Sequence, residues 1–296
     1  MSAKIKIEIP DRLTERTFHQ IQDQLPNKIF RKYKTILFDF ESIVFISPFG
    51  MILFIIFVEH LIYNLSKEIY VKLPGVDCNE ESAKCISVLC RLRFFECLPK
   101  KVIFENEKPK TKKTLVGSNP EILELTKLNS IEDSLGVITK AKKALRKTNY
   151  DEAHVSDIAI MISEIVQNIF IHSESERPSF LAIQSFPKLK KVQMAIADSG
   201  IGIPETLKRT SVYSNFTKDY QLIFQSLKLG VSQFQEKEKR GEGLKRCRLI
   251  ARKHSAEVFV RSNAGYCHLD YEKEKLHGNE IPFLIGTQIF INFPMN

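Results

Sequence analysis

Two side chains that could move a proton and hold a metal ion lie one helical turn apart near the middle of the chain. The segment from Val155 to His172 repeats apolar residues at the three- and four-residue spacing of a half-buried helix. Within it, Glu164 and Asn168 are four residues apart and therefore share a face. A carboxylate can act as a general base, and an amide oxygen is a hard neutral ligand that suits Mg²⁺. As alternatives, either residue could belong to the polar surface of the helix.

A glycine-rich turn follows the next predicted strand. Val192–Ala197 is a short apolar run, and Asp198-Ser-Gly-Ile-Gly202 continues directly from it. Gly200 and Gly202 carry no side chain, so the backbone there can approach a ligand closely. The carboxylate of Asp198 can accept hydrogen bonds from a ligand, or from its own turn as an Asx turn.

Two further glycine patterns come later in the chain. Arg240-Gly-Glu-Gly-Leu-Lys245 precedes a predicted helix, and Gly286 with Thr287 opens an apolar strand that runs to Pro294. Each pattern alone is most often just a turn. Four patterns in this order and at these separations favour one composite site.

Together the four patterns resemble the nucleotide site of the GHKL ATPases, the superfamily of gyrase, the Hsp90 chaperones, histidine kinases, MutL and the anti-sigma-factor kinases. The resemblance implies ATP and Mg²⁺ as ligands. It also implies a Bergerat fold, an α/β sandwich in which helices cover one face of a mixed sheet.

The resemblance gives the helix and the first turn their roles. Asn168 would bind the Mg²⁺ ion that bridges the phosphates, and Glu164 would orient or deprotonate the attacking nucleophile. Asp198 would accept a hydrogen bond from the exocyclic amine of adenine. Gly200 and Gly202 would admit the nucleotide next to bare backbone.

The second glycine box would bind phosphate. Gly241 and Gly243 would offer backbone N–H groups at a helix start, assisted by the helix dipole, and Leu244 belongs to the same box. The fuller kinase pattern has a further Gly-Leu, whereas Leu244 is followed here by Lys245 and Arg246. A basic residue at this point could touch phosphate or be an ordinary solvated cation.

Two more residues complete the predicted site. Thr287 would reach adenine through a water molecule, or it is an ordinary strand threonine. His172 lies one turn past Asn168 on the same face, where it would be near the phosphates or simply on the helix surface.

These residues need a sandwich of helices and strands to position them. We expect strands at 122–126, 180–184, 192–197, 257–261, 266–270 and 287–293, and helices at 131–147, 155–172, 222–229 and 244–254. The polar insert from Glu205 to Arg240 separates the two glycine boxes. Inserts of this length are usually functional lids, so we predict that it is mobile without nucleotide and closes over ATP.

The first 105 residues alternate between predicted strands and helices, which favours an α/β domain. We expect strands at 4–9, 35–46, 68–73 and 101–104, helices at 13–29, 51–65 and 80–92, and a turn at 47–50. Leu37–Phe40, followed by Phe45–Gly50 and an apolar helix, resembles the STAS domains of anti-sigma-factor antagonists. In regulatory members a phosphorylatable serine precedes the glycine, but Phe49 stands there, and Ser47 stands where an aspartate would be. We therefore predict a STAS-like docking scaffold that lacks the phosphorylation switch.

The domain plan is thus a STAS-like domain at 1–105, a linker at 106–117 rich in Lys, Pro, Thr and Asn, and a GHKL ATPase domain at 118–296.

The chain has 296 residues, 43% of them hydrophobic and 27% charged, which is typical of a soluble globular protein. Its net charge of +9 is spread over scattered lysines without a nucleic-acid motif, which argues against a nucleic-acid partner. Ser42–Val58 is uncharged but shorter than the roughly 20 residues of a membrane span. The six cysteines show no zinc spacing, and no signal peptide is recognisable, so we expect a cytoplasmic protein with reduced thiols.

Three functions fit the predicted site. The protein could be an anti-sigma-type kinase that phosphorylates a serine or threonine of a partner, an ATP-driven conformational switch, or a non-catalytic nucleotide sensor. No histidine lies between Glu105 and Glu152, which disfavours a sensor histidine kinase. A protein partner, such as a STAS protein or a sigma-factor-like regulator, is expected, and a homodimer is compatible with the sequence.

Overall fold

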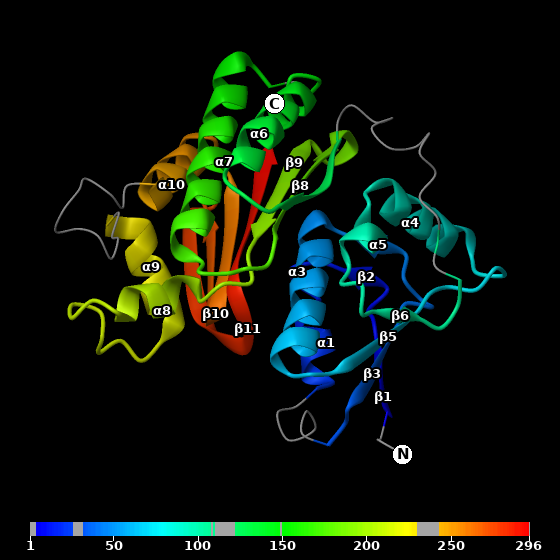
Figure 1. Cartoon of the computed structure of the whole chain (residues 1–296). Helices are drawn as coiled ribbons and strands as arrows, with labels where there is room; N and C mark the ends of the chain where they lie inside the picture. Colours follow the sequence, from blue (N-terminus) through cyan, green and yellow to red (C-terminus); the bar gives the residue numbers. More distant parts are fainter. Residues whose placement is uncertain are drawn as a thin grey trace. The chain divides into compact units, whose positions relative to one another are not determined.

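The chain divides into two compact units, Met1–Asn119 and Pro120–Asn296. The computed structural model describes residues 4–25, 32–107, 109, 122–148, 150–229 and 243–295 (Figure 1). Most of the predicted linker, residues 106–117, lies outside these ranges. The two units are described separately below.

The first unit contains a parallel four-stranded sheet in the order β1-β3-β5-β6. Its elements are β1 Lys4–Glu8, β2 Arg12–Leu13, α1 His19–Asp23, β3 Thr35–Asp39, β4 Phe45–Ile46, α3 Pro48–Glu59, a π-helical turn His60–Asn64, β5 Glu68–Lys72, α4 Glu80–Arg91, α5 Phe94–Cys97 and β6 Ile103–Phe104. Parallel pairing requires crossover connections, which α3 and α4 provide.

The apolar helix α3 is the core of this unit, because all twelve of its residues are buried. Phe54 packs edge-on against Phe38 and Phe40 of the β3 region, with ring centroids 5.1 and 5.0 Å apart. The predicted turn at 47–50 is wrong: Pro48 is the first residue of the helix, where its missing N–H costs nothing. Ser47 is the N-cap, and its side chain accepts a hydrogen bond from the Gly50 N–H.

The long helix predicted at 13–29 is also wrong. Leu13 belongs instead to the short strand β2, which pairs with β4, and only His19–Asp23 is helical in the described part of this range. The hydroxyl of Thr17 donates to the Arg12 carbonyl and accepts from the Thr14 N–H. Such side-chain hydrogen bonds compete with helix formation and favour a turn.

The second unit is a sheet covered on one face by helices (Figure 1). Its elements are β7 Ile122–Leu128, α6 Glu132–Leu145, α7 Glu152–His172, β8 Ser179–Phe186, a 3₁₀ turn Pro187–Leu189, β9 Lys191–Ala197, α8 Gly202–Lys208, α9 Asp219–Leu229, α10 Gly243–Lys253, β10 Glu257–Asp270 and β11 Lys275–Pro294. The strand order is β10-β11-β9-β8-β7. The four pairings in this order are all antiparallel, so the predicted mixed sheet is wrong.

The outer strands are longer than the sequence pattern predicted. Residues 257–261 and 266–270 belong to one element, β10, which pairs with β11 along its length with register shifts at Asn263. Phe259 stacks on His268 with ring centroids 4.2 Å apart, which shows that β10 bends back on itself near Asn263. Asn263 has a φ of 54°, a conformation that asparagine tolerates better than most residues.

Helix α7 is the central helix of the sandwich. Eight of its residues are buried, among them Ile158, Ile162 and Ile165, and they pack with strand residues such as Ile196 and Ile289. By length and composition α7 is also the one described helix apolar enough to cross a membrane, but a core helix passes the same test. The Asp151 side chain caps the helix by accepting from the His154 N–H.

Candidate functional site

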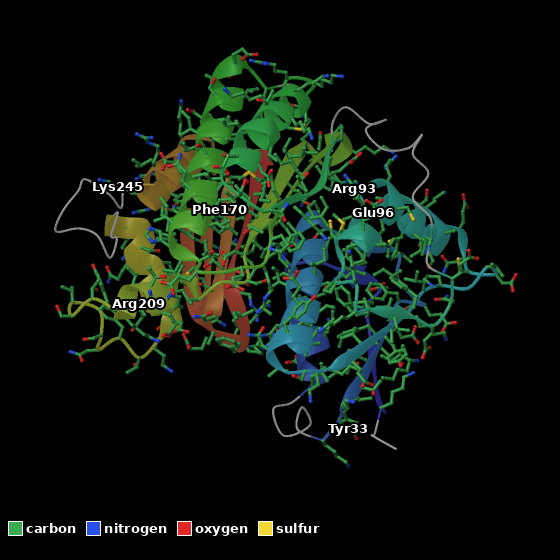
Figure 2. All side chains as sticks on the ribbon, in the orientation of Figure 1. Tyr33, Arg93, Glu96, Phe170, Arg209 and Lys245 are labelled. Atoms are coloured by element: carbon green, nitrogen blue, oxygen red, sulfur yellow. The ribbon has the colours of Figure 1, made fainter. Side chains whose placement is uncertain are left out.

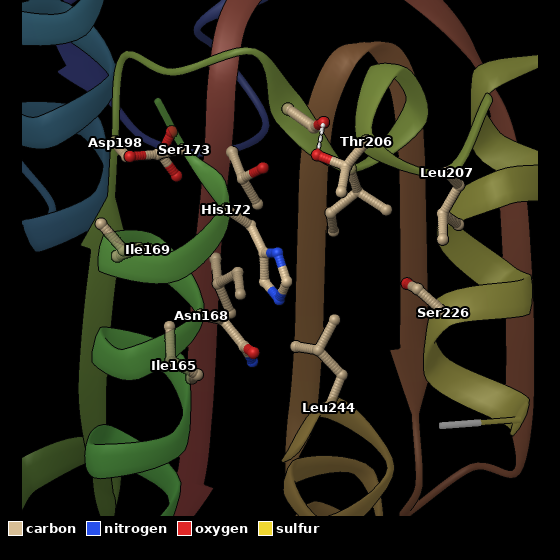
Figure 3. Close-up of a pocket in the computed structure, with 14 residues that line it drawn as sticks. Ile165, Asn168, Ile169, His172, Ser173, Asp198, Thr206, Leu207, Ser226 and Leu244 are labelled. Atoms are coloured by element: carbon tan, nitrogen blue, oxygen red, sulfur yellow. Dashed lines mark hydrogen bonds between the residues drawn. The ribbon is translucent and has the colours of Figure 1, made fainter. Parts of the chain in front are cut away.

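A pocket opens where the end of α7, the turn after β9, and helices α8, α9 and α10 meet (Figure 3). In the close-up, Asn168 and His172 project into it from α7, and Ser226 on α9 lies across from them. The pocket is lined by Ile165, Asn168, Ile169, His172, Ser173, Asp198, Gly202, Ile203, Thr206, Leu207, Ser226, Leu244, Thr287 and Ile289. Six of the predicted site residues are therefore brought together: Asn168, His172, Asp198, Gly202, Leu244 and Thr287.

One end of the pocket is formed by Asn168 and the start of α10. A Cβ atom added to Gly243 would lie 2.8 Å from Glu164 Oε2 and 3.3 Å from Asn168 Nδ2. Gly243 thus packs closely against the predicted base, Glu164, and the predicted metal ligand, Asn168. The Nδ2 atom of Asn168 is buried and has no hydrogen-bond partner among the described residues. An unpartnered buried amide is costly, and a ligand in the pocket would satisfy it.

Glu164 lies beside this end but is not among the residues that line the pocket. Its Oε1 accepts a hydrogen bond from Arg246 Nη1 of α10 at 2.7 Å. The Glu164 side chain is 22% exposed and that of Arg246 58% exposed, so this ion pair lies close to solvent. Lys245, the other basic residue of this box, is exposed on α10 and does not line the pocket (Figure 2).

The other end of the pocket is a buried carboxylate. Asp198 is 3% exposed, and burial raises the pKa of its carboxyl to about 7, although hydrogen bonds from the backbone N–H groups of Gly200 and Thr287 lower it. Its Oδ1 accepts from the Gly200 N–H at 2.7 Å, so the turn is an Asx turn. A carboxylate has room for further donors, which leaves Asp198 able to accept from a ligand amine as well.

The glycines of the first turn pack against protein. A Cβ on Gly200 would lie 2.1 Å from the Ser173 carbonyl oxygen, at the end of α7. Gly202 has a φ of +82°, and its Cβ would approach the side chains of Ser262 and Asn263 at 2.8 Å. In this structure these glycines are needed so that the turn can dock on α7 and β10. Gly202 also lines the pocket, whereas Gly200 does not.

Thr287 and Asp198 are held together by the sheet. The Asp198 N–H donates to the Thr287 carbonyl at 2.9 Å, and a Cβ on Gly286 would lie 2.0 Å from the Asp198 carbonyl oxygen. Gly286 has a φ of +87°. The Gly-Thr pair therefore lets β11 pass against the base of the Asp198 turn, which supports its predicted place in the site.

Two polar residues that the sequence did not indicate support this end. Ser262 Oγ accepts from the Ile203 N–H at 2.9 Å and lies 2.9 Å from Thr287 Oγ1. Asn263 Nδ2 donates to the Ile201 carbonyl at 2.8 Å. Both residues fix α8 to the sheet. No local pattern marks them, because their role depends on the bend of β10.

The second glycine box is only partly described. Gly243 and Leu244 begin α10, but Arg240 and Gly241 lie outside the described residues. The predicted contact of Gly241 with phosphate stays a prediction.

The insert predicted to be mobile from Glu205 onwards contains two packed helices. Leu222 and Ile223 of α9 are fully buried, and α8 and α9 are joined by a small apolar cluster of Leu207, Tyr213 and Leu222. This packing argues against mobility of α8 and α9 without nucleotide, whereas the predicted closure of the insert over ATP stays a prediction. Residues 230–240 lie outside the described part of the chain.

Helices thus cover one face of the sheet, and the pocket is lined by the Asn168 amide and the buried Asp198 carboxylate. Residues 153–295 match the model of the histidine kinase-, DNA gyrase B- and HSP90-like ATPase family. The match supports the predicted GHKL-class ATPase domain and ATP as its ligand. A comparison with curated proteins found no match.

Proposed function

We propose that the second unit binds Mg²⁺–ATP in this pocket and transfers the γ-phosphoryl group to a serine or threonine of a protein partner, as a cytoplasmic signalling or stress-response regulator. The observation that carries the proposal is the pocket itself. Asn168, with its unpartnered Nδ2 atom, and the buried Asp198 carboxylate lie at opposite ends (Figure 3), and apolar side chains such as Ile169 and Ile203 also line the pocket. This matches a nucleotide, which has an apolar base bearing an amine at one end and metal-bound phosphates at the other.

The residues present fit the magnesium ion that ATP requires. The amide of Asn168 carries the oxygen donor that Mg²⁺ prefers, and the ion fills the rest of its coordination shell with water and phosphate oxygens. When bound, the ion would neutralise charge on the phosphates during transfer. Gly243, which packs against Asn168, would offer its backbone N–H to the same phosphates.

Glu164 would accept the proton of the attacking hydroxyl. That oxygen forms a bond to the γ-phosphorus, the bond from phosphorus to the departing ADP oxygen breaks, and the proton passes to the carboxylate. Glu164 lies near solvent, so a hydroxyl of a partner protein can reach it. Its hydrogen bond to Arg246 must open, or the pair must turn together, before Glu164 meets the hydroxyl.

The Glu164–Arg246 pair also favours a second candidate, a nucleotide-dependent switch or sensor with little or no turnover. In this structure one oxygen of the Glu164 carboxylate already accepts a hydrogen bond from Arg246, so that oxygen is occupied and does not meet a hydroxyl until the pair opens. In either case we propose that the STAS-like first unit docks a protein partner or the ATPase unit. Its parallel sheet and buried helix supply a rigid scaffold for that role.

The test is incubation with γ-labelled ATP and Mg²⁺ while free phosphate and labelled protein are followed together. Label on a protein serine or threonine supports the kinase, and free phosphate alone supports the ATP-driven switch. Binding with neither product supports the sensor. Failure to bind ATP would overturn the proposal as a whole.

The matched variant is Glu164→Gln, which keeps the shape of the side chain. It should retain ATP affinity and lose turnover by roughly 10²-fold or more, the usual contribution of a general base. Unchanged turnover in this variant would remove Glu164 from the mechanism. GTP serves as the control nucleotide, because equal affinity for GTP would remove the proposed role of Asp198.

A further inference from the structure

A second cluster of ligand-type side chains lies on β10, away from the nucleotide pocket. Glu257, His268 and Asp270 each bring one ligand atom within 4.8 Å of the others. None of the three lines the nucleotide pocket. Glu257 and Asp270 instead line a separate surface cavity together with Asn292.

The bend of β10 assembles this cluster from its two ends. The Tyr271 N–H donates to the Ala256 carbonyl, which holds the two ends of the strand side by side. The His268 ring is fixed by parallel stacking on Phe259, with an angle of 7° between the rings. The imidazole is therefore oriented before any ligand arrives, which reduces the entropy lost on binding.

Hydrogen bonds connect Glu257 to His268 and to Asn292. His268 Nε2 lies 2.9 Å from Glu257 Oε1, and Asn292 Nδ2 donates to Glu257 Oε2 at 2.8 Å. The Oδ1 atom of Asn292 is buried and has no hydrogen-bond partner among the described residues. Asn292 thus orients the Glu257 carboxylate as a supporting residue.

Two carboxylates this close need positive charge between or beside them. In this structure Lys273 Nζ provides it, 2.9 Å from Asp270 Oδ2. The Lys273 side chain is 64% exposed, so its ammonium can leave for solvent at little cost. A divalent ion would take the place of this ammonium beside Asp270 and would bind one ring nitrogen of His268.

We propose that Glu257, His268 and Asp270 bind a divalent transition-metal ion, of which Zn²⁺ is the test case, and that the ion joins the two ends of β10. One imidazole nitrogen and two carboxylate oxygens form a donor set that suits Zn²⁺, with water in the remaining position. The Lys273 ammonium in this structure marks where the positive charge is required.

The experiment is a Zn²⁺ titration of the full chain without nucleotide, followed by X-ray absorption of the loaded protein. We expect one ion per chain in a shell of nitrogen and oxygen at about 2.0–2.2 Å. A shell containing sulfur at about 2.3 Å would show that cysteines bind the ion and would overturn the proposal. Absence of binding would do the same.

Variants then locate the ion. His268→Gln should weaken Zn²⁺ binding by more than about tenfold, and Asn292→Ala by about tenfold, the usual effect of a supporting residue. His277→Gln is the matched control, because His277 is the exposed cross-strand partner of His268 and is outside the cluster. Equal effects at His268 and His277 would contradict the assignment. If His268→Gln does not fold, Glu257→Gln carries the same expectation.

Discussion

At the scale of single residues, the pocket contains two polar groups that are buried without the full set of hydrogen bonds or charges that would stabilise them. Asn168 Nδ2 is buried without a partner, and the Asp198 carboxyl is buried with a pKa of about 7. Both arrangements cost free energy in the absence of a ligand. Such costs are typical of functional sites, since the ligand supplies the missing interactions.

The buried Asp198 predicts how stability depends on pH. Its pKa is raised from 3.8 to about 7, so its contribution to stability is present below the ordinary value and is lost as the pH rises through about 7. Asp198→Asn removes this titration. We expect the thermal midpoint of the nucleotide-free wild type to fall relative to that of the variant between these two pH values, as measured by calorimetry. Parallel pH profiles would show that Asp198 keeps an ordinary pKa.

Asn168→Ala should separate binding from folding. The buried Nδ2 atom of Asn168 has no partner among the described residues, so removing it costs little and the stability without nucleotide should stay within about 1 kcal/mol of the wild type. The Mg²⁺-dependent part of ATP affinity should be lost, as measured by titration with and without Mg²⁺. A large loss of stability without nucleotide would show instead that Asn168 has a structural role.

Some site residues could be predicted because their types and their spacing in the sequence already indicate a shared site. Glu164 and Asn168 are four residues apart, which is enough to place them on one face of a helix, and Asp198 precedes two glycines at a recognisable spacing. Ser262 and Asn263 could not be predicted, because they meet the turn after β9 only once β10 bends. The Arg246 contact with Glu164 likewise depends on how α10 packs against α7.

At the scale of elements, long helices with a regular apolar spacing were predictable, whereas a short helix directly after a glycine turn was not. Helices α7 and α10 begin and end within a few residues of the predicted ranges. Helix α8 was missed, because Gly202 and Pro204 suggest a turn. Pro204 lies in the first helical turn, where its missing N–H is tolerated.

Gly286 is tightly packed and Gly136 is not, so alanine substitutions at these two positions should affect stability in opposite directions. Gly286→Ala places a Cβ 2.0 Å from the Asp198 carbonyl oxygen at a positive φ, so we expect a loss of at least about 2 kcal/mol of stability and weaker ATP binding. Gly136→Ala, in the exposed interior of α6, meets nothing within 4 Å and should add about 0.5–1 kcal/mol. Denaturant unfolding measures both. Similar effects at the two positions would contradict the close packing of β11 against the Asp198 turn.

Helix α9 provides a test of what moves when nucleotide binds. Leu222 and Ile223 are fully buried, and a Cβ on Gly265 of β10 would lie 2.6 Å from the Tyr220 nitrogen, so the helix packs closely on the sheet. We expect the amides of residues 219–229 to be protected from hydrogen exchange both with and without a non-hydrolysable ATP analogue. Protection gained there only on binding would restore the original lid prediction for this segment.

At the scale of the whole molecule, the two predicted domains differ in how far comparison with a known family supports them. The family match covers residues 153–295 and so supports the second unit alone. The alternating strands and helices predicted an α/β first unit, and the structure adds its parallel sheet and aromatic core, but neither shows what the unit binds. Partner recognition depends on surfaces, and neither apolar periodicity nor motif spacing encodes those surfaces.

The division into two units predicts that the ATPase unit works alone. Every described residue that lines the nucleotide pocket lies between Ile165 and Ile289, and the core around α7 is built from residues 123–293. A fragment of residues 120–296 should therefore fold cooperatively and bind Mg²⁺–ATP within about threefold of the full chain, a difference below roughly 1 kcal/mol. Calorimetry and nucleotide titration of the two proteins measure this. A fragment that folds but binds ATP much more weakly would show that the first unit completes or regulates the nucleotide site.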